Sequence, residues 1–363
     1  MADQFVAADP VFTVDGRRVP DLGRDCLALV VEESTEGLRT CVAHLLANAP
    51  RQVPNDDVVE YLDGRTLDFG KQLAVSIGPS GNERVVFAGA ISAIEAVFDE
   101  GDAPHVSVYA EDALMKLRQT RRSATYTRVS DADIVRRIAA RHGLSAQADV
   151  TGPTYAVVQQ VNETDLGFLR DRAARLGAEL WAAGTTLHFA TRDRRTGPAV
   201  TLAQGKDLLT VSLRADLAHQ RGSVGVSGYD AQARERIDVV AGRSAVTGEI
   251  SGGRSGLDVL EQTGGTHTDQ RSTLTPVTGA EARAWAEADL RCRARRFVTV
   301  VGTASGVPEL SVGARLTLTA VGAPFAGGGY YVTRARHTFA RDEGGLRVHF
   351  TAERATLTSR GSR

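Results

Sequence analysis

Short stretches of alternating hydrophobic and polar residues occupy two separate parts of the chain. The first part runs from about Phe12 to Val108 and the second from about Val200 to Leu357, and Gly, Pro, Asn and Asp interrupt both of them. Several such runs in each hundred residues are typical of antiparallel strands. The pattern therefore predicts two antiparallel β domains, each closed or nearly closed into a barrel.

One sequence motif occurs in both of these parts. LDFGKQLAVSIG in the first part matches LSVGARLTLTAVG in the second, and the later segment VSVYAEDA matches VHFTAERA with a slip of one residue. The positions that match in the first pair of segments are Leu67, Gly70 and Leu73, and Leu310, Gly313 and Leu316. We interpret the two regions as copies of one β unit, in which Leu73 and Leu316 are equivalent inward-facing residues.

An acidic tripeptide also recurs at the same place in the two units, as Asp99-Glu100-Gly101 and as Asp342-Glu343-Gly344. Adjacent carboxylates such as these, or Asp56-Asp57, could suggest glycoside cleavage, which needs two carboxyl groups across a sugar ring. A chain with one active site has no need of the same pair twice. The recurrence therefore indicates a turn.

The region between the two β parts has a helical pattern. In SDADIVRRIAARHGL, Ser130 is a good N-cap with Asp133 three residues later, and Gly143 supplies the stop. NETDLGFLRDRAARLG places its Leu and Ala residues on one stripe and ends at Gly177. AELWAAGTTLHFA follows as a hairpin that turns at Gly184. An α/β domain is therefore predicted between the two β domains.

The chain thus divides into three predicted domains, and its fold class is mainly β with an α/β insertion (α+β). The first β barrel spans residues 1–122, the α/β insertion 123–195 and the second barrel 196–363. Within the second barrel, a Gly-, Ser- and Thr-rich stretch near 242–276 is too polar to pack, so we expect a mobile loop. A helix is predicted near 279–296, because Thr278 and Glu281 have capping-box spacing.

Composition and charge argue against several classes of protein. The 43 Lys and Arg residues against 44 Asp and Glu residues give a formal net charge of −1, which provides no overall attraction for nucleic acid or an anionic membrane. Cys26, Cys41 and Cys292 are an odd number without CxxC spacing, which favours a reducing compartment over a disulfide framework. The N-terminus lacks the features of a signal peptide, and the apolar runs are too short to span a bilayer. We expect the chain to fold in the cytoplasm.

Motifs of catalysis and metal binding are absent from the sequence. No GxSxG, HExxH, EF-hand or Walker sequence occurs. The eight histidines are scattered, and the most suggestive pair, His267 with Asp269, lies in the polar stretch near 242–276, where a surface role is far more common. No catalytic, cofactor-binding or metal-ligating residue is therefore predicted.

Arginines gather in two clusters along the chain. The first consists of Arg118, Arg121, Arg122 and Arg128, and the second of Arg291, Arg293, Arg295 and Arg296. The first fits a solvated linker and the second a helix C-terminus, where positive charge suits the helix dipole. Alternatively, the clusters line a channel or meet an acidic partner. The sequence leaves both interpretations open.

The segment VVQQVNETDLGFLRDRAARLGAELWAAGTTLHF, at 157–189, resembles the NETD signature of the late control protein D family. That family includes the baseplate hub of contractile phage tails and the N-terminal part of VgrG spike proteins of type VI secretion. The residues that carry the signature here are Asn162, Glu163, Thr164, Asp165, Phe168, Leu169 and Gly177. SDADIVRRIAARHGLSAQAD and SVGVSGYDAQARE resemble the family's preceding helix and its strand-then-GYD segment.

The resemblance implies two barrels related by duplication, with an α/β insertion between them, and a ring of three chains. Such a homotrimer presents six similar positions, which would match a sixfold tail tube to a threefold spike. The implied partners are the tail tube protein, a separate trimeric spike protein and baseplate wedge components, with no direct contact to nucleic acid or membrane. We expect assembly in the cytoplasm and then a place in a virion or injection particle. The six repeated positions are expected near the docking surfaces.

The sequence departs from VgrG because it stops at Arg363 without an OB-fold or a repetitive β-helix, so we expect the spike to be another chain. The resemblance favours a structural, non-enzymatic hub. The alternative is a tail-associated peptidoglycan hydrolase, since hubs of this family can work beside lysozyme domains. A nucleic-acid-binding barrel is a third reading, and the neutral net charge argues against it.

Overall fold

The computed structural model describes residues 9–47, 59–79, 81–100, 103–250, 252–265, 267–271, 274–342 and 345–358. Strand is the commonest secondary structure among these residues, and the longer helices lie in the insertion and between residues 256 and 295. The predicted fold class, mainly β with an α/β insertion, is confirmed.

The elements follow one another in three groups. The first group is β1 (Val11–Val14), β2 (Arg17–Arg18), α1 (Pro20–Asp25), β3 (Cys26–Ser34), β4 (Thr40–Leu46), β5 (Gln72–Ile77), β6 (Arg84–Val97) and β7 (His105–Glu111). The second is α2 (Met115–Arg118), β8 (Arg121–Val129), α3 (Asp131–Arg141), β9 (Ser145–Asp149), β10 (Tyr155–Thr164), α4 (Asp165–Leu176), β11 (Ala178–Ala183) and β12 (Thr186–Thr191).

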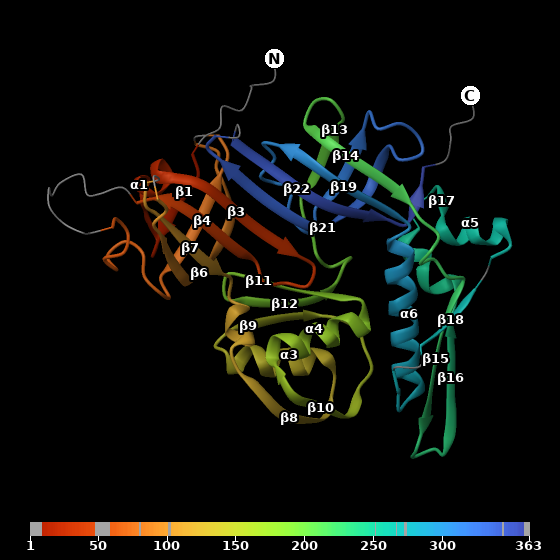
Figure 1. Cartoon of the computed structure of the whole chain (residues 1–363). Coiled ribbons are helices and arrows are strands. Elements are labelled where there is room, and N and C mark those ends of the chain that lie inside the picture. The colour runs from red at the N-terminus through yellow and green to blue at the C-terminus, as the bar shows by residue number, and fades with distance from the viewer. Residues whose placement is uncertain are drawn as a thin grey trace, which may run out of the picture.

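The third group contains the remaining strands and helices. It is β13 (Ala199–Ala203), β14 (Leu208–Ala215), β15 (Ser223–Asp230), β16 (Glu235–Ala241), the 3-10 helix η1 (Arg243–Glu249), β17 (Arg254–Ser255), α5 (Gly256–Thr263), β18 (Thr268–Arg271), α6 (Gly279–Arg295), β19 (Val298–Ser305), β20 (Arg315–Thr319), β21 (Gly327–Ala340), β22 (Gly345–Arg354) and β23 (Thr356–Leu357). Figure 1 shows the first and third groups side by side at the top, the insertion below them, and α6 with the β15–β16 ribbon at the lower right.

The strands of both β parts form one continuous sheet. Its order is β14-β19-β22-β21-β3-β4-β7-β6-β5-β1-β2, and β20 and β13 branch from β21. β21 joins the two parts by pairing with β3, from Arg334 opposite Ser34 to Ala340 opposite Ala28. The sequence predicts two separate barrels, whereas the structure has one shared sheet. The reason is that β21, at 14 residues, is long enough to run past its own half and reach β3.

The strands on the two sides of this junction follow the same order. The first half reads β3-β4-β7-β6-β5-β1 and the second reads β14-β19-β22-β21-β20-β13. Corresponding strands also come in the same sequence along the chain. One pair differs, because β1 runs antiparallel to β5 whereas β13 runs parallel to β20. The two halves therefore share a strand topology.

The turn before the fifth strand of each half is also built alike. Gly70 and Gly313 both have a positive φ, which glycine adopts without strain. The Gly70 N–H donates to the Ile91 carbonyl at 2.9 Å, and the Gly313 N–H donates to the Val332 carbonyl at 3.0 Å. The glycines of the sequence repeat thus occupy the same position in the two halves.

A β-bulge recurs at the same place in both halves. Pairing of β6 with β7 skips Ser92, and pairing of β21 with β22 skips Thr333. The Ser92 hydroxyl donates to the Tyr109 carbonyl at 3.3 Å, and the Thr333 hydroxyl donates to the Thr351 carbonyl at 3.2 Å. Bulges bend a strand and re-aim the residues after it. Both long strands therefore turn away from their first partner at the same point.

Three hydrophobic cores are present in the described part of the chain. One lies in each half, and the core of the first half includes Phe339, which β21 contributes across the junction. The third core belongs to the insertion and also contains Val224, Trp285 and Leu290. The sequence assigned these three residues to the second β domain. They pack against the insertion because α6 lies between β15–β16 and α4.

The predicted helices of the insertion are present with their caps. Ser130 and Asp133 form a capping box at the start of α3, and Gly177 ends α4 in the left-handed conformation. The predicted hairpin turns at Gly184, which has a φ of 57°. Thr278 caps α6 by accepting from the N–H of Glu281. Local sequence signals were sufficient for these elements.

The prediction of a loop near 242–276 was wrong. That stretch contains η1, β17, α5 and β18. Ser255 and Asp258 form a capping box, and the helix that follows buries Leu257, Val259 and Leu260. Ser, Gly and Thr dominate the stretch, but these three apolar residues at helical spacing are enough to anchor it. Among the described residues, no helix is both long and apolar enough to cross a bilayer.

Candidate functional site

Several strand edges of the large sheet have no partner strand among the described residues, and two of them, on β6 and β14, lie on long strands. β6 pairs with β5 only as far as Ala90, so the same edge of residues 92–97 is open. β14 pairs with β19 on one side, and its other edge carries only an isolated bridge between Gln204 and Leu208. Open edges present rows of backbone donors and acceptors to any strand that can reach them. These two edges are the candidate docking sites.

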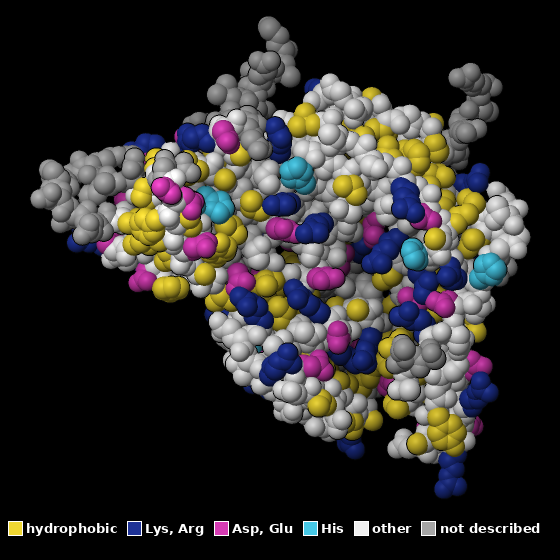
Figure 2. Space-filling view, viewed as in Figure 1, with side chains coloured by type: hydrophobic (Ala, Val, Ile, Leu, Met, Phe, Trp, Pro, Cys, Tyr) yellow, Lys and Arg dark blue, Asp and Glu magenta, His cyan; other side chains and the backbone are white. Residues whose placement is uncertain are grey.

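The side chains beside the open edge of β6 are unusually apolar for a surface. Ala93 and Ala96 are exposed, and Phe98, directly after the strand, is 63% exposed. Figure 2 shows hydrophobic side chains gathered where Figure 1 places β4, β6 and β7. Lysine or proline, which commonly protect a free edge, does not occur in β6. An apolar open edge of this kind favours a protein partner.

The junction of β21 with β3 shows how such an edge is filled within the chain. On the core side, Phe339 pairs with Leu29, and both are buried. On the other side, Arg334 donates to Glu32 at 2.7 Å across the two strands. The junction therefore combines an apolar stripe with a charged pair on the opposite face.

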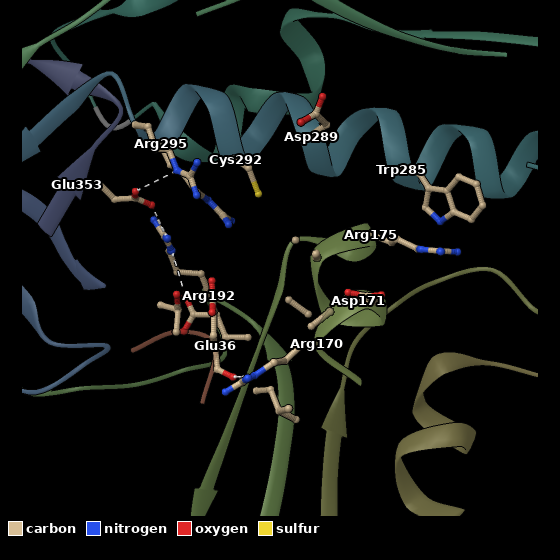
Figure 3. Close-up of a pocket in the computed structure, with 18 of the residues that line it drawn as sticks. Glu36, Arg170, Asp171, Arg175, Arg192, Trp285, Asp289, Cys292, Arg295 and Glu353 are labelled. Carbon is tan, nitrogen blue, oxygen red and sulfur yellow. Dashed lines mark hydrogen bonds and ion pairs between the residues drawn. The ribbon is translucent and has the colours of Figure 1, made fainter. Parts of the chain in front are cut away.

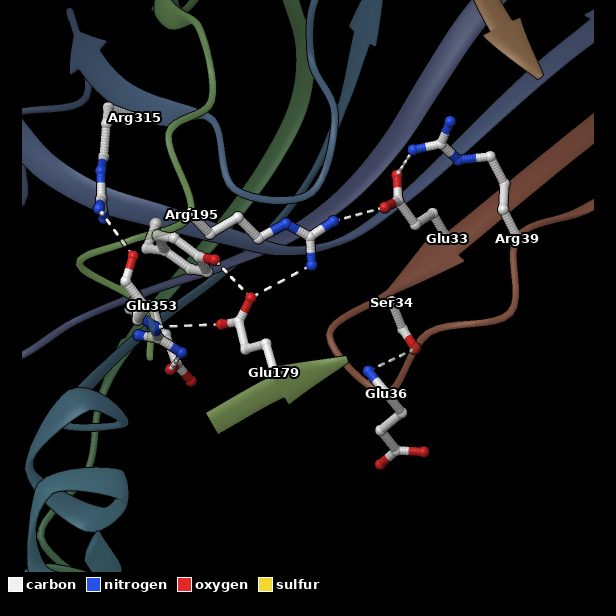
Figure 4. A network of polar contacts seen from close by, with 10 residues as sticks. Glu33, Ser34, Glu36, Arg39, Glu179, Arg195, Arg315 and Glu353 are labelled. Atoms are coloured by element: carbon white, nitrogen blue, oxygen red, sulfur yellow. Dashed lines mark hydrogen bonds and ion pairs between the residues drawn. The ribbon is translucent and has the colours of Figure 1, made fainter. Parts of the chain in front are cut away.

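A buried polar network fixes this junction to the insertion (Figure 4). Arg195 donates to Glu33 of β3 at 2.5 Å and to Glu179 of β11 at 3.2 Å. The Tyr331 hydroxyl of β21 donates to the same Glu179 at 2.6 Å, and Arg39 donates to Glu33 at 2.6 Å. Burial, with Glu179 close by, raises the pKa of Tyr331. The network ties the first half, the second half and the insertion at one point.

A cavity of about 670 Å³ lies between α4 and α6 (Figure 3). Asp171 and Arg175 line it from α4, and Trp285 and Cys292 line it from α6. The Arg175 guanidinium lies over the Trp285 ring at 5.4 Å. The cavity is therefore walled by the two helices that join the insertion to the third group of elements.

The chemistry of this cavity does not favour catalysis. Arg192 pairs with the buried carboxylates of Glu353 at 2.5 Å and Glu179 at 3.5 Å, so neither is a free acid or base. Burial raises the pKa of the Cys292 thiol, although Arg295 nearby opposes the rise. A protonated thiol is a poor nucleophile. Within the described residues, no group of three or more His, Cys, Asp or Glu side chains could hold a metal ion.

The NETD signature surrounds a buried carboxylate at the start of α4. Thr164 caps the helix by accepting from the Gly167 N–H at 3.1 Å. Asp165 is fully buried, and its partners are Gln160, His142, Arg141 and Arg122. Burial opposes ionisation, yet the hydrogen bonds and positive charges of these partners lower the pKa of Asp165. Asp165 therefore holds the insertion together rather than a ligand.

The other signature residues are also structural. Phe168 is buried and stacks on Tyr126 with the ring centroids 5.9 Å apart, and Leu169 is fully buried. Asn162 has a φ of 49°, and the strand pairing shifts register between Gln160 and Glu163. The segment that carries the family resemblance thus specifies the fold of the insertion.

The repeated leucines lie inside the two halves. They are Leu67, Leu73, Leu310 and Leu316, and all four are buried. Leu73 pairs with Gly89 of β6, and Leu316 pairs with Tyr330 of β21. Their side chains belong to the two separate cores, so no partner can touch them directly. That these positions lie near docking surfaces stays a prediction.

The remaining candidate residues are partly engaged within the chain. Arg118 pairs with Glu111, and Arg295 donates to Glu249 at 2.6 Å. Arg293 binds Asp269, the carboxylate that the sequence placed beside His267. Whether other arginines of the two clusters line a channel stays a prediction. Parts of the acidic motifs lie outside the described residues. They are Asp56 and Asp57 of the acidic pair, and Gly101, Glu343 and Gly344 of the two acidic tripeptides.

A family model described as the Alg8 N-terminal domain matches residues 54–341. The chain belongs to this family. No curated protein matches it. Its fold is shared by solved phage tail proteins, and the specific assignment to the late control protein D family stays a prediction.

Three solved structures resemble this Alg8 N-terminal domain protein along nearly its whole length. The 43 kDa tail protein of prophage MuSo2 from Shewanella oneidensis has a TM-score of 0.65 at 13% identity, with 96% of this chain and 98% of that chain covered. A tail protein from Neisseria meningitidis has a TM-score of 0.64 at 13% identity, covering 95% and 96%. An Escherichia coli component of the type VI secretion system has a TM-score of 0.59 at 15% identity, covering 96% and 77%.

The residues of the open edges in this Alg8 N-terminal domain protein were missed at the level of sequence. Glu95 in β6, Phe98 directly after β6, and Arg214 in β14 belong to no motif. A signal was nevertheless available. Phe98 stands just before the first acidic turn segment, as Phe339 stands shortly before the second. Extending the repeat alignment through this point pairs an exposed phenylalanine with a buried one.

Proposed function

We propose that the chain is the structural hub of a contractile phage tail or phage-like injection particle. Three copies form a ring that joins a sixfold tail tube to a threefold spike. Two observations support this proposal: the fold shared with tail proteins over nearly the whole of both chains, and the strand order that occurs twice within one sheet. The second observation carries the proposal, because it gives one chain two similar docking positions.

The symmetry argument follows from that duplication. A hub between a sixfold tube and a threefold spike must present six similar edges on one side and three on the other. Three chains with two similar halves each meet both requirements, and heterologous contacts between them close a ring. The proposed partners are the tail tube protein, a separate trimeric spike protein and wedge components, and the resemblance to late control protein D suggests the same. Assembly in the cytoplasm would precede incorporation into the particle.

The proposed role is non-enzymatic. The rival is a tail-associated peptidoglycan hydrolase, which needs a carboxyl group poised as an acid and a second group as base or nucleophile. The two most buried carboxylates of the cavity between α4 and α6, Glu179 and Glu353, are already paired with Arg192. Cell-wall lysis by the purified chain, abolished by one carboxylate substitution, would replace the hub by the hydrolase.

The direct test of the hub is assembly. The purified chain should have a native mass of three times 38.6 kDa, and it should bind the tube and spike proteins encoded beside it. A chain that stays single and binds neither protein at micromolar concentration contradicts the proposal. The Val85→Ala variant serves as the control and should leave assembly unchanged, because Val85 is exposed on the part of β6 that already pairs with β5.

A further inference from the structure

The β21–β3 junction joins an edge of the second half, on β21, to an edge of the first half, on β3. Each half also contains a counterpart of the strand that the other half contributes to this junction. β21 pairs first with β20 and then, after its bulge, with β3 on the same edge. β6 pairs first with β5 and, after its bulge, has nothing on that edge among the described residues. β14 occupies in the second half the place that β3 has in the first. The open strands are therefore the counterparts of the joined ones.

From this equivalence we propose that β6 of one copy pairs antiparallel with β14 of a second copy, in the register of the internal junction. The proposal rests on the proposed ring and specifies its contact. Counterparts can be assigned residue by residue from the pairings with the shared neighbours. Arg336 of β21 corresponds to Glu95 of β6, since both follow the bulge by the same number of residues. Glu32 of β3 corresponds to Arg214 of β14, since they face Thr40 and Thr299.

This assignment fixes the register of the contact between copies. Arg336 lies opposite Glu32 in the internal junction, so Glu95 of one copy should lie opposite Arg214 of the next. The charges are reversed but still opposite. A mismatch would have placed like charges across the strands, which is destabilising. The side chain of Arg214 is 74% exposed and pairs with Asp216 at 2.5 Å, and the exposed Glu95 accepts from the Tyr109 hydroxyl at 2.7 Å, so each must exchange a surface contact to meet the other.

The other face of the contact is apolar in the same register. Ile94, Ala96 and Phe98 of one copy should face three residues of the next copy, which are Ala215, Leu213 and Val211. Val211 and Leu213 already pack against the core of the second half. In the internal junction the corresponding pair Phe339 and Leu29 is apolar and buried, whereas His337 faces Val31 and Ala335 faces the buried Glu33. Burial of an exposed apolar stripe supplies the driving force for the contact.

Phe98 is the residue that the second copy would cover most. Its counterpart Phe339 belongs to the core of the other half, across the junction, and is 3% exposed, whereas Phe98 is 63% exposed. Pairing of β6 with β14 would place Phe98 against the core of the neighbouring second half. The eight strands from β14 to β6 would then continue from copy to copy, and a closed ring would leave neither edge open.

Disulfide trapping tests the register in the full chain. Directly opposed residues of antiparallel strands have Cα atoms about 4.5–5.5 Å apart, within the range of a disulfide. The variant Glu95→Cys with Arg214→Cys should form covalent dimers and trimers on oxidation. A matched variant, Glu95→Cys with Thr210→Cys, places the second thiol roughly 13 Å away along the strand and should not. The parent chain, with its buried Cys26 and Cys41 and its half-buried Cys292, measures the background.

Four further variants calibrate the oxidation and test the charge pair. Glu32→Cys with Arg336→Cys should form a disulfide within one chain, which calibrates the oxidation. Glu95→Arg and Arg214→Glu should each weaken self-association at least tenfold, and the two together should restore it. A trimer that shows no 95–214 cross-link, or no restoration, overturns the strand pairing while the proposed hub stands. A chain that stays single in every variant overturns both.

Discussion

Phe98 and Phe339 stand at corresponding places in the two halves, but one is exposed and the other is buried. Substitution of each therefore separates the effect on folding from the effect on association. Phe339 is buried in the first-half core, and Phe98 is on the surface of the single chain. Phe339→Ala removes a ring from a packed core, which costs about 3–5 kcal/mol of unfolding free energy. Phe98→Ala should change the stability of the single chain by no more than about 0.5 kcal/mol, because the ring already contacts water.

The order of the two effects should reverse when association is measured. Loss of the Phe98 ring removes an apolar anchor from the contact between copies, and such anchors contribute about 2 kcal/mol or more. That corresponds to roughly a thirtyfold weaker self-association. Urea denaturation at nanomolar concentration measures the first effect, and sedimentation velocity over a concentration series measures the second.

Two results would refute the reasoning. If Phe98→Ala destabilised the single chain as much as Phe339→Ala does, the two positions would not differ in burial as the structure has them. If Phe98→Ala left self-association unchanged, the open edge of β6 would not be a contact between copies. Val85→Ala is a suitable control, because this residue is 66% exposed on the part of β6 that β5 already covers.

Three further predictions concern the fold itself. Leu73→Asp and Leu316→Asp should each lower the unfolding free energy by several kcal/mol in urea, because each buries an unpaired charge; a neutral result for one breaks the equivalence of the halves. Arg195→Ala should cost at most about 3–5 kcal/mol, since two buried carboxylates each lose one of their two arginines; thermal unfolding of the variant checks it. Burial, aided by Arg39, lowers the pKa of His337 to about 4, below its unfolded value near 6.5. The free energy of unfolding is therefore highest above pH 6.5, where His337 is neutral in both states, and it falls by up to about 3 kcal/mol as the pH falls toward 4. His337→Gln should flatten this pH dependence in urea titrations.

Local features of the fold could be predicted from the sequence because they depend on nearby residues. The cap of α3 at Ser130 and the stop of α4 at Gly177 need only a few neighbouring side chains. The repeat was visible because Gly70 and Gly313 are required by the same turn. The helix at 256–263 was not predicted, because its apolar stripe is short and glycine and serine surround it. Its start could have been recognised from the capping-box spacing of Ser255 and Asp258.

The shared sheet could not be predicted in the same way. Its junction pairs residues about 300 positions apart, as Arg334 with Glu32 shows. Strand periodicity gives the face of each strand but not the identity of its partner. The candidate site depends on this junction, because an edge can be recognised as open only when its counterpart is seen to be filled. For that reason Glu95, Phe98 and Arg214 became candidates only in three dimensions.

Electron microscopy of the purified chain tests the central claim most directly. The account predicts a ring of three chains whose averaged end-on view shows six lobes of similar size, alternating between first and second halves. The strand order that occurs twice in the sheet is the basis for this expectation. A ring with three lobes, a different number of chains, or single molecules under conditions where the tube and spike proteins assemble would contradict it.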